Sequence, residues 1–490
     1  MSALSVGGVL LATRLPGAGV LAAALAGALV VVAALVVLMR RHADAFALLA
    51  VFTLPFRIPI ATGGRTVNLL VPLYLVVAAG AVAHLLPRLP ALRGVLKRDS
   101  FERLRERSLW TTPDGVTAIL LGAIVLYALQ ASYSADRVKA LENVAFFYLP
   151  FALLFLTLRE ARWRDALIAR CLSVMVALAV IFAGVGFIEY ARKSLFLNPK
   201  VVAANQYDNF FRVNSVFFDP SIYGRFLVLV MIALMTVVLV RHRASVSTSA
   251  ATAVRERRTL LGAAAVLAWL MAGLVTSFSQ SSIAALLLGL AVLGAWCWGV
   301  RPTVYLSGGL VALALVFVLL APSGLHFGLK GSSGSAANAT SGRTTLVGGG
   351  LELFTQRPLE GYGSGSFETE YKRHGKTDAV NATSASHTIP VTIAAEQGIV
   401  GLAVYLALLA SAFVVLFRGA ARSPARIAIA ACFAALVLHT WTYADFLEDP
   451  FTWALLAVGL ALARPRDDGG DSGIGERAQA LAPAAAPSSV

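Results

Sequence analysis

Long apolar runs recur along most of this chain, and they constrain its fold more than any other feature. A helix of about 20 residues crosses the hydrocarbon of a bilayer. Backbone groups in lipid must be hydrogen-bonded within the protein, which predicts a helix for each run, and the runs lack the alternating polarity of membrane-barrel strands. The run 44–61 contains Pro55 and Arg57 and is therefore either a full span or a broken, interfacial segment. The thirteen predicted spans are 17–38, 44–61, 67–86, 115–133, 141–158, 166–190, 221–240, 259–276, 282–299, 303–321, 398–417, 426–442 and 449–464.

The charge and cysteine content also fit a membrane protein. Of the 490 residues, 58% are hydrophobic and 14% are charged, whereas soluble domains are about a quarter charged. The net charge of +15 does not predict nucleic-acid binding here, because Lys and Arg collect in the cytoplasmic loops of membrane proteins. A polyanionic or diphosphate ligand is the remaining alternative. Cys171, Cys297 and Cys432 lie in apolar runs without metal-binding spacing, so neither disulfides nor a cysteine-bound metal are expected.

The loop charges predict how the spans are oriented. Even numbers of spans separate the basic loops, so these loops share one side of the membrane, which the positive-inside rule assigns to the cytoplasm. The long loops 191–220 and 322–397 and the acidic loop 442–450 then face outward. The tail 466–490, rich in Gly, Ala, Pro and Ser, is expected to be disordered on the cytoplasmic side. The basic loops are 39–44, 88–108, 159–165, 241–258 and 418–426.

Two arginines accompany the predicted start of the span at residue 221. Asp219 and Pro220 fit the N-cap and first position of a helix. Arg212 lies just before this start, and Arg225 lies about one turn inside. An arginine in a span is costly unless it is paired or reaches the headgroups. Arg225 is therefore either a headgroup anchor or, with Arg212, a fork for the oxygens of a phosphate or diphosphate.

A third arginine and a glycine-rich run lie in the large outer loop. Ser341 is a candidate cap for a helix of about 343–356, which places Arg343 in its first turn. The helix dipole disfavours a cation there, so either a bound anion or a neighbouring carboxylate is expected beside Arg343. The run "GYGSGSF" (361–367) lacks the Lys-Ser/Thr of a P-loop. It is either a tight turn or a nest of backbone N–H groups that binds an anion.

A single histidine and a single carboxylate mark the entry to the next span. His387 precedes Pro390, and an imidazole can act as an acid or a base near neutral pH. Glu396 follows nine residues later, which is about 180° away on an unbroken helix. The two form a dyad only if Pro390 bends the segment. Alternatively, Glu396 caps or anchors the helix that follows the break at Gln397–Gly398.

Other polar groups also lie at the outer helix ends. Gln280 sits in the short turn 276–282, and His439 lies near Asp445 at the outer end of its span. These side chains are either structural or in contact with bound sugar. Carboxylates are nearly absent from the middle of the spans, which disfavours a proton- or ion-coupled transporter.

The order of these motifs resembles the O-antigen ligase and polymerase superfamily of membrane glycosyltransferases. The resemblance covers about residues 205–465. It rests on Arg212 with "SVFFDP", on the turn 276–282, on "GRTTLVGGGLELFTQRPLEGYGSGSF" and on "SHTIPVTIAAEQGIVGL". Two departures concern ligand contacts: Gln280 stands where the family often has arginine, and Thr388 follows His387 where asparagine is usual.

The resemblance implies a GT-C-like, all-helical integral membrane bundle of about 12–14 spans with a large extracytoplasmic loop. Residues 1–200 would form additional spans, 205–465 the catalytic membrane region including loop 322–397, and 466–490 the tail. It places the protein in the bacterial cytoplasmic membrane, with its active site outside. The donor would be an oligosaccharide on a polyprenyl diphosphate, and the acceptor a hydroxyl of a glycan or glycolipid. No metal, cofactor or nucleic acid is implied.

The resemblance also implies roles for individual residues. His387 would take the acceptor proton or orient the acceptor, with Glu396 in support. Arginines would neutralise the charge that develops on the leaving diphosphate. The diphosphate-binding residues would be Arg212 and Arg343, with Arg225 as a third, and the residues in contact with acceptor or sugar would be Gln280, Tyr362 and His439.

Three alternatives remain open. A protein O-oligosaccharyltransferase shares the donor and differs in the acceptor. A lipid or glycan permease needs a polar path through the bilayer centre, whereas the polar residues here gather at one face. A non-catalytic scaffold of a cell-envelope assembly would tolerate changes at His387 and Arg343.

Overall fold

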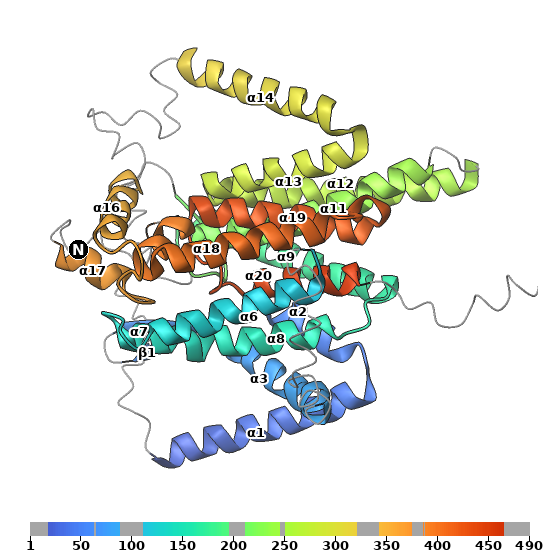
Figure 1. The fold of residues 1–490 in the computed structure, drawn as a ribbon. Coiled ribbons are helices and arrows are strands. Elements are labelled where there is room, and N and C mark those ends of the chain that lie inside the picture. The colour runs from blue at the N-terminus through green and yellow to red at the C-terminus, as the bar shows by residue number, and fades with distance from the viewer. Residues whose placement is uncertain are drawn as a thin grey trace, which may run out of the picture.

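The protein is a bundle of helices that run side by side (Figure 1). A computed structural model describes residues 18–62, 65–88, 111–195, 211–245, 250–320, 343–374, 386 and 388–464. Within these ranges, nine helices are long and apolar enough to cross a membrane, and Val71–Leu85 and Pro450–Ala463 are shorter apolar helices. The prediction of a polytopic helical membrane protein is confirmed.

The element labels follow Figure 1. The described elements are α1 (Ala18–Arg41), α2 (Ala45–Thr53), β1 (Ile58–Thr62), β2 (Arg65–Leu69), α3 (Val71–Gly80), the π-helix η1 (Ala81–Leu85), the 3₁₀ helix η2 (Leu86–Arg88), α6 (Pro113–Gln130), α7 (Arg137–Asn143), the π-helix η3 (Val144–Tyr148), α8 (Leu149–Arg159), α9 (Asp165–Arg192), α11 (Pro220–Ser245), α12 (Ala250–Thr276), α13 (Gln280–Trp298), α14 (Val300–Leu320), α16 (Arg343–Gln356), α17 (Phe367–Arg373), α18 (Ile389–Phe417), the 3₁₀ helix η4 (Ala420–Arg422), α19 (Pro424–Thr442) and α20 (Pro450–Ala463).

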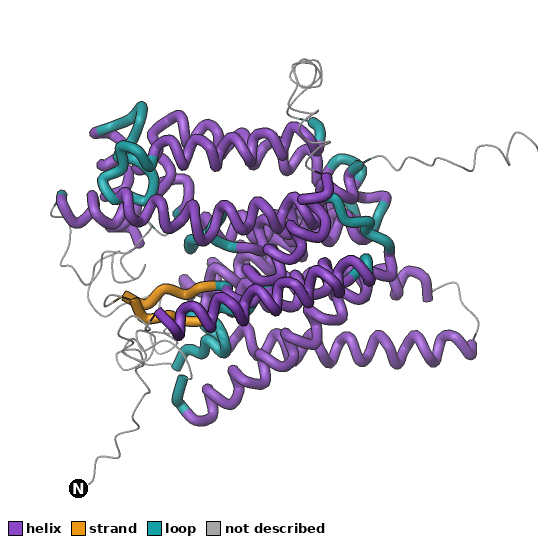
Figure 2. Tube along the Cα trace, turned by 90° about the horizontal axis from the view of Figure 1, so that it is seen from below, coloured by secondary structure: helices purple, strands orange, loops and turns teal. Residues whose placement is uncertain are grey.

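The predicted helix over 44–61 is shorter in the structure. Helix α2 ends at Thr53, and residues beyond Pro55 form the antiparallel hairpin β1–β2, with Ile58 opposite Leu69. Figure 2 shows this hairpin in orange at one end of the bundle. Pro55 has no N–H to continue a helix. The following Ile, Val and Thr residues favour extended backbone, a preference that the apolar pattern alone does not reveal.

The segments predicted to be cytoplasmic meet at one end of the bundle. Asp44 pairs with Arg164 and with Arg170. Arg464 pairs with Glu160, and Arg159 pairs with Asp114. The other end carries α7, β1, α16 and α17 (Figure 1, left) and is here called the α16 end. The sequence-based grouping of these loops therefore agrees with their positions in the bundle.

Small residues allow the central helices α11, α13 and α19 to approach closely. A side chain at Gly224 of α11 would meet the Ser282 side chain of α13, and one at Gly289 of α13 would meet Ile232 of α11. Close approach at glycine and serine is the usual means by which helices pack in membranes. The α16-end termini of α11 and α13 are thereby held together, which brings the segments that precede them side by side.

Candidate functional site

The glycine loop, defined as residues 357–366, crosses the α16 end between α16 and α17. Its backbone is hydrogen-bonded to α18: Tyr362 donates to the Ala395 carbonyl (3.2 Å) and Gly363 to the Glu396 carbonyl (2.7 Å). Gly361 has φ +68°, and a side chain there would reach the Glu396 carbonyl. Only glycine combines this left-handed backbone with so close an approach. The loop is therefore a fixed turn built onto α18.

Glu396 occupies the anion-binding nest that the glycine loop forms. Its Oε2 accepts from the N–H of Gly365 (2.9 Å), and its Oε1 accepts from the N–H of Phe367 (3.0 Å). The residue is 6% exposed. A carboxylate held by backbone N–H groups is the arrangement expected of a nest. The geometry therefore favours the alternative in which Glu396 anchors its segment, and its catalytic role stays a prediction.

Helix α6 and the residues after it clamp the glycine loop from the other side. Ser134 Oγ donates to the Ser364 carbonyl (2.7 Å), and Ser364 Oγ donates to the Tyr127 carbonyl (2.8 Å). The phenol of Tyr133 donates to the Glu360 carbonyl (2.7 Å). All but Tyr133 and Glu360 are buried. The N-terminal third of the chain, which the sequence assigned only to additional spans, thus contributes to the candidate site.

Replacing Glu396 by glutamine is expected to destabilise the α16 end. The amide NH₂ would face one of the two backbone N–H groups, which leaves a buried donor without an acceptor and costs about 1–3 kcal/mol. Thermal unfolding of the purified protein in nanodiscs measures this loss. Glu360→Gln, an exposed carboxylate in the same loop, serves as the control. Equal melting temperatures for both variants would contradict the anchoring role.

Helix α18 is interrupted at Gly398. Gly398 has φ +65° and ψ −164°, outside the helical region, so α18 consists of two helical pieces. The N–H of Ile399 donates to the Pro358 carbonyl (2.8 Å), which ties the break to the glycine loop. The break that the sequence places at Gln397–Gly398 is confirmed. His387 lies outside the described residues, whereas its neighbour Ser386 donates through Oγ to the Thr388 carbonyl (2.8 Å) at the entry to α18.

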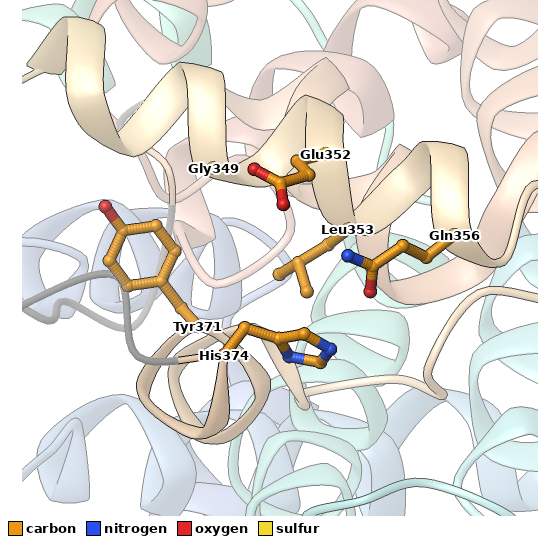
Figure 3. A pocket seen from close by; sticks show the side chains of 6 residues that line it. All are labelled: Gly349, Glu352, Leu353, Gln356, Tyr371 and His374. Carbon is orange, nitrogen blue, oxygen red and sulfur yellow. The ribbon is translucent and has the colours of Figure 1, made fainter.

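Tyr362 faces the ends of α16 and α17 rather than open solvent. Its hydroxyl donates to Gln356 Oε1 (2.7 Å), and the Arg357 guanidinium lies 4.7 Å from the centre of its ring. Burial raises the pKa of the Tyr362 phenol above its usual value. Beside it, carboxyl, amide, phenol and imidazole groups line a groove between α16 and α17 (Figure 3). The groove is narrow and has no room for a water molecule between its walls; its lining residues are Gly349, Glu352, Leu353, Gln356, Tyr371 and His374.

The Arg212 segment and the turn 276–282 lie side by side. Arg212 Nε donates to the Ser277 carbonyl (3.3 Å), and the N–H of Val213 donates to the Thr276 carbonyl (3.2 Å). Arg212 is partly exposed. Gln280 is the first residue of α13 and is exposed. Two of the motifs that carry the resemblance are therefore neighbours in space.

Arg225 forms an internal ion pair. Its Nη2 lies 2.8 Å from Asp449 Oδ2, and both side chains are almost fully buried, at 1% and 2% exposure. Its Nη1 donates to the carbonyls of Ala444 and Asp445 (3.2 and 3.3 Å). The headgroup-anchor alternative is wrong, because the guanidinium lies in the interior. Diphosphate binding by Arg225 stays a prediction, and the charge is already balanced by Asp449.

His439 contacts serines of α13. Its Nε2 lies 3.1 Å from Ser282 Oγ and 3.4 Å from Ser281 Oγ, and the residue is fully buried. These contacts match the structural alternative for His439. The side chain of Arg343, the first residue of α16, lies outside the described side chains, as does Ser341. Their predicted roles therefore stay predictions.

Glu448 is a carboxylate at the α16 end that the sequence analysis did not single out. It lies in the loop between α19 and α20 and is half-buried. The Tyr148 hydroxyl donates to its Oε1 (3.3 Å). Burial, followed by the negative charge of Asp445, raises the pKa of Glu448 to about 7. Its acidic loop was visible in the sequence, but its contact with Tyr148, 300 positions away, was not.

One comparison with known proteins identifies a family. Residues 263–406 match the family model described as O-antigen ligase. A search of curated proteins found no match. The matched residues contain the turn 276–282, the start of α16, the glycine loop and Glu396, the elements that the structure gathers at the α16 end. Through this segment, the chain is similar to the O-antigen ligase family.

Proposed function

We propose that the protein transfers or polymerises an oligosaccharide from a polyprenyl diphosphate carrier onto an acceptor hydroxyl at the outer face of the bacterial cytoplasmic membrane. The observation that carries this proposal is the family match over the glycine loop and α18. The positive-inside rule supports the orientation, because the basic loops belong to the end opposite the α16 end.

The proposed site combines groups for the donor and for the acceptor. Arg212 and Arg343 bind the diphosphate, whose negative charge grows as it leaves. Arg225, paired with Asp449, fixes the loop between α19 and α20 beside them. His387 orients the acceptor hydroxyl or takes its proton. Gln280 and Tyr362 contact the sugar or the acceptor.

The chemistry needs no nucleotide sugar. The acceptor oxygen attacks the anomeric carbon in line with the diphosphate, which leaves with the bonding electron pair, so the configuration at that carbon is inverted. A glycan, glycolipid or protein hydroxyl would serve equally in this step, and the acceptor is decided by what binds at the α16 end.

The first test follows the release of free polyprenyl diphosphate by protein in nanodiscs that contain the lipid-linked oligosaccharide. Release is expected to depend on a glycan or glycolipid acceptor. Arg343→Ala and His387→Ala are each expected to lower turnover by about 10²–10³-fold, because each removes a group that acts on the transition state. Arg301→Ala, an exposed arginine at the opposite end, is expected to retain wild-type turnover.

Three results would count against the proposal or against its site. An intact donor that releases nothing with glycan, glycolipid or peptide acceptors would indicate a permease or a scaffold. Release that depends on a peptide alone would indicate protein O-glycosylation. Full turnover in both site variants would move the active site away from His387 and Arg343.

A further inference from the structure

Transfer to an acceptor hydroxyl releases a proton, and the Glu396 carboxylate is poorly placed to take it. Both of its oxygens accept backbone hydrogen bonds, from Gly365 and Phe367. These two bonds hold the carboxylate in the nest, where it anchors the glycine loop to α18. Glu448 is half-buried rather than enclosed, and its hydrogen-bond donor is a phenol that can also accept.

Glu448 stands at the end of a buried polar chain. Tyr148 donates to it, the rings of Tyr148 and Tyr127 pack edge to face with centres 4.6 Å apart, and Asn143 Nδ2 donates to the Tyr127 hydroxyl (2.8 Å). Asn143, Tyr127 and Tyr148 are 6%, 3% and 3% exposed, and the Asn143 Oδ1 atom has no hydrogen-bond partner among the described residues.

The backbone that carries this polar chain of side chains is unusual as well. Residues Val144–Tyr148 form the π-helix η3, directly after Asn143. Short π-helical turns inside helices occur often at functional sites, because they change the direction of a side chain within an otherwise regular helix. Here the turn ends at Tyr148, which places that hydroxyl on Glu448. The same α6 residue, Tyr127, accepts Ser364 Oγ of the glycine loop through its carbonyl, so the chain joins Glu448 to that loop.

Charged groups from its own loop and from two further elements act on Glu448. Asp445 of its own loop disfavours the ionised carboxylate, whereas Lys139 of α7 and the Tyr148 hydrogen bond favour it. Glu396 of α18 is also close enough to interact electrostatically with Glu448. Burial is the largest influence, and together these effects raise the pKa of Glu448 to about 7. A carboxyl group with a pKa near the working pH is suited to accept and release a proton.

We propose that Glu448, held by Tyr148, accepts the proton of the acceptor hydroxyl. This inference rests on the proposed function and leaves His387 to orient the acceptor. The acceptor oxygen bonds to the anomeric carbon as the bond from that carbon to the diphosphate oxygen breaks. The diphosphate takes the bonding electron pair, and the hydroxyl proton passes to a Glu448 oxygen and then to water.

The first experiment measures carrier release against pH for Glu448→Gln. In the wild type, kcat/KM is expected to rise with pH through about 7, since only the ionised carboxylate accepts a proton. Glu448→Gln is expected to lower kcat/KM at pH 8 by about 10²–10³-fold and to abolish this rise. Glu142→Gln, a partly exposed carboxylate of neighbouring α7, is expected to keep both the rate and the profile.

Charge variants that leave Glu448 in place separate proton transfer from a structural role. Lys139→Met removes a positive charge and should move the midpoint of the pH profile upward. Asp445→Asn removes a negative charge and should move it downward. Tyr148→Phe removes a bond that favours the carboxylate and should also move it upward. These three variants keep the Glu448 side chain, so they still test proton transfer if Glu448→Gln folds poorly.

The outcomes are distinguishable. Opposite shifts for Lys139→Met and Asp445→Asn, with a flat profile for Glu448→Gln, support the inference. A wild-type profile in Glu448→Gln, or unchanged midpoints in all three charge variants of an active protein, overturns it. A wild type that releases no carrier with any acceptor overturns the proposed function instead.

Discussion

Replacing Asp449 by alanine is expected to lower the free energy of unfolding by about 3–5 kcal/mol, because it leaves a buried arginine without its counter-charge. The Arg225 and Asp449 side chains are 1% and 2% exposed and lie 2.8 Å apart. Asp449 also caps α20 by accepting the N–H of Phe451 (3.0 Å). The variant therefore loses an ion pair and a helix cap together.

Thermal unfolding in nanodiscs measures this effect against two controls. Glu256→Ala breaks the pair with Arg241, whose side chains are 28% and 47% exposed, and such a pair contributes at most about 1 kcal/mol. The double variant Arg225→Met/Asp449→Ala is expected to recover part of the lost stability, because it removes the unpaired charge as well. If Asp449→Ala unfolds at the same temperature as Glu256→Ala, the buried pair does not stabilise the fold.

Replacing Gly398 by alanine is expected to lower the free energy of unfolding by about 2–6 kcal/mol and to abolish carrier release. Its backbone, at φ +65° and ψ −164°, lies in a region that essentially only glycine adopts, which accounts for about 1–3 kcal/mol. A methyl group there would also collide with the Leu359 carbonyl of the glycine loop, at a further cost of about 1–3 kcal/mol.

Gly348→Ala is the matched control for Gly398→Ala. Gly348 lies in helix α16, is exposed, and has nothing within 4 Å of an added methyl group. Alanine in a helix interior is about 0.5–1 kcal/mol more favourable than glycine, so this variant should unfold at a slightly higher temperature and remain active. Normal stability and activity in Gly398→Ala would show that the break in α18 tolerates a side chain.

The fold could be predicted largely from local patterns. The runs that became α6, α9, α11, α13 and α19 were visible because hydropathy and length decide whether a segment can cross a bilayer. A break in the run 44–61 was anticipated from Pro55, but the hairpin after it was not, since an apolar run with β-branched residues fits a helix or a hairpin equally well. The start of α16 at Arg343 and the break at Gly398 were both predicted, because glycine and helix-terminus signals act within a few residues.

The candidate site was predicted less completely, because its polar groups are paired across long stretches of chain. The resemblance implied a supporting role for Glu396, and the sequence left open that it anchors its helix. Which groups it anchors to was not visible, because its oxygens bind the N–H groups of Gly365 and Phe367, 31 and 29 positions away. Glu448 went unnoticed, because an acidic residue in an outer loop is ordinary until Tyr148 is seen beside it.

By itself, the sequence determined that the protein is a polytopic helical membrane protein, predicted which loops share a side, and gave the order in which the family motifs follow one another. These properties depend on composition over one helix length or one loop. Only the tertiary structure decided which charges are balanced internally, as for Arg225 and Asp449, and which distant side chains meet, as for Tyr148 and Glu448. Such pairings depend on how helices far apart in the chain pack, and packing follows from the shapes of all the contacting side chains rather than from any one segment.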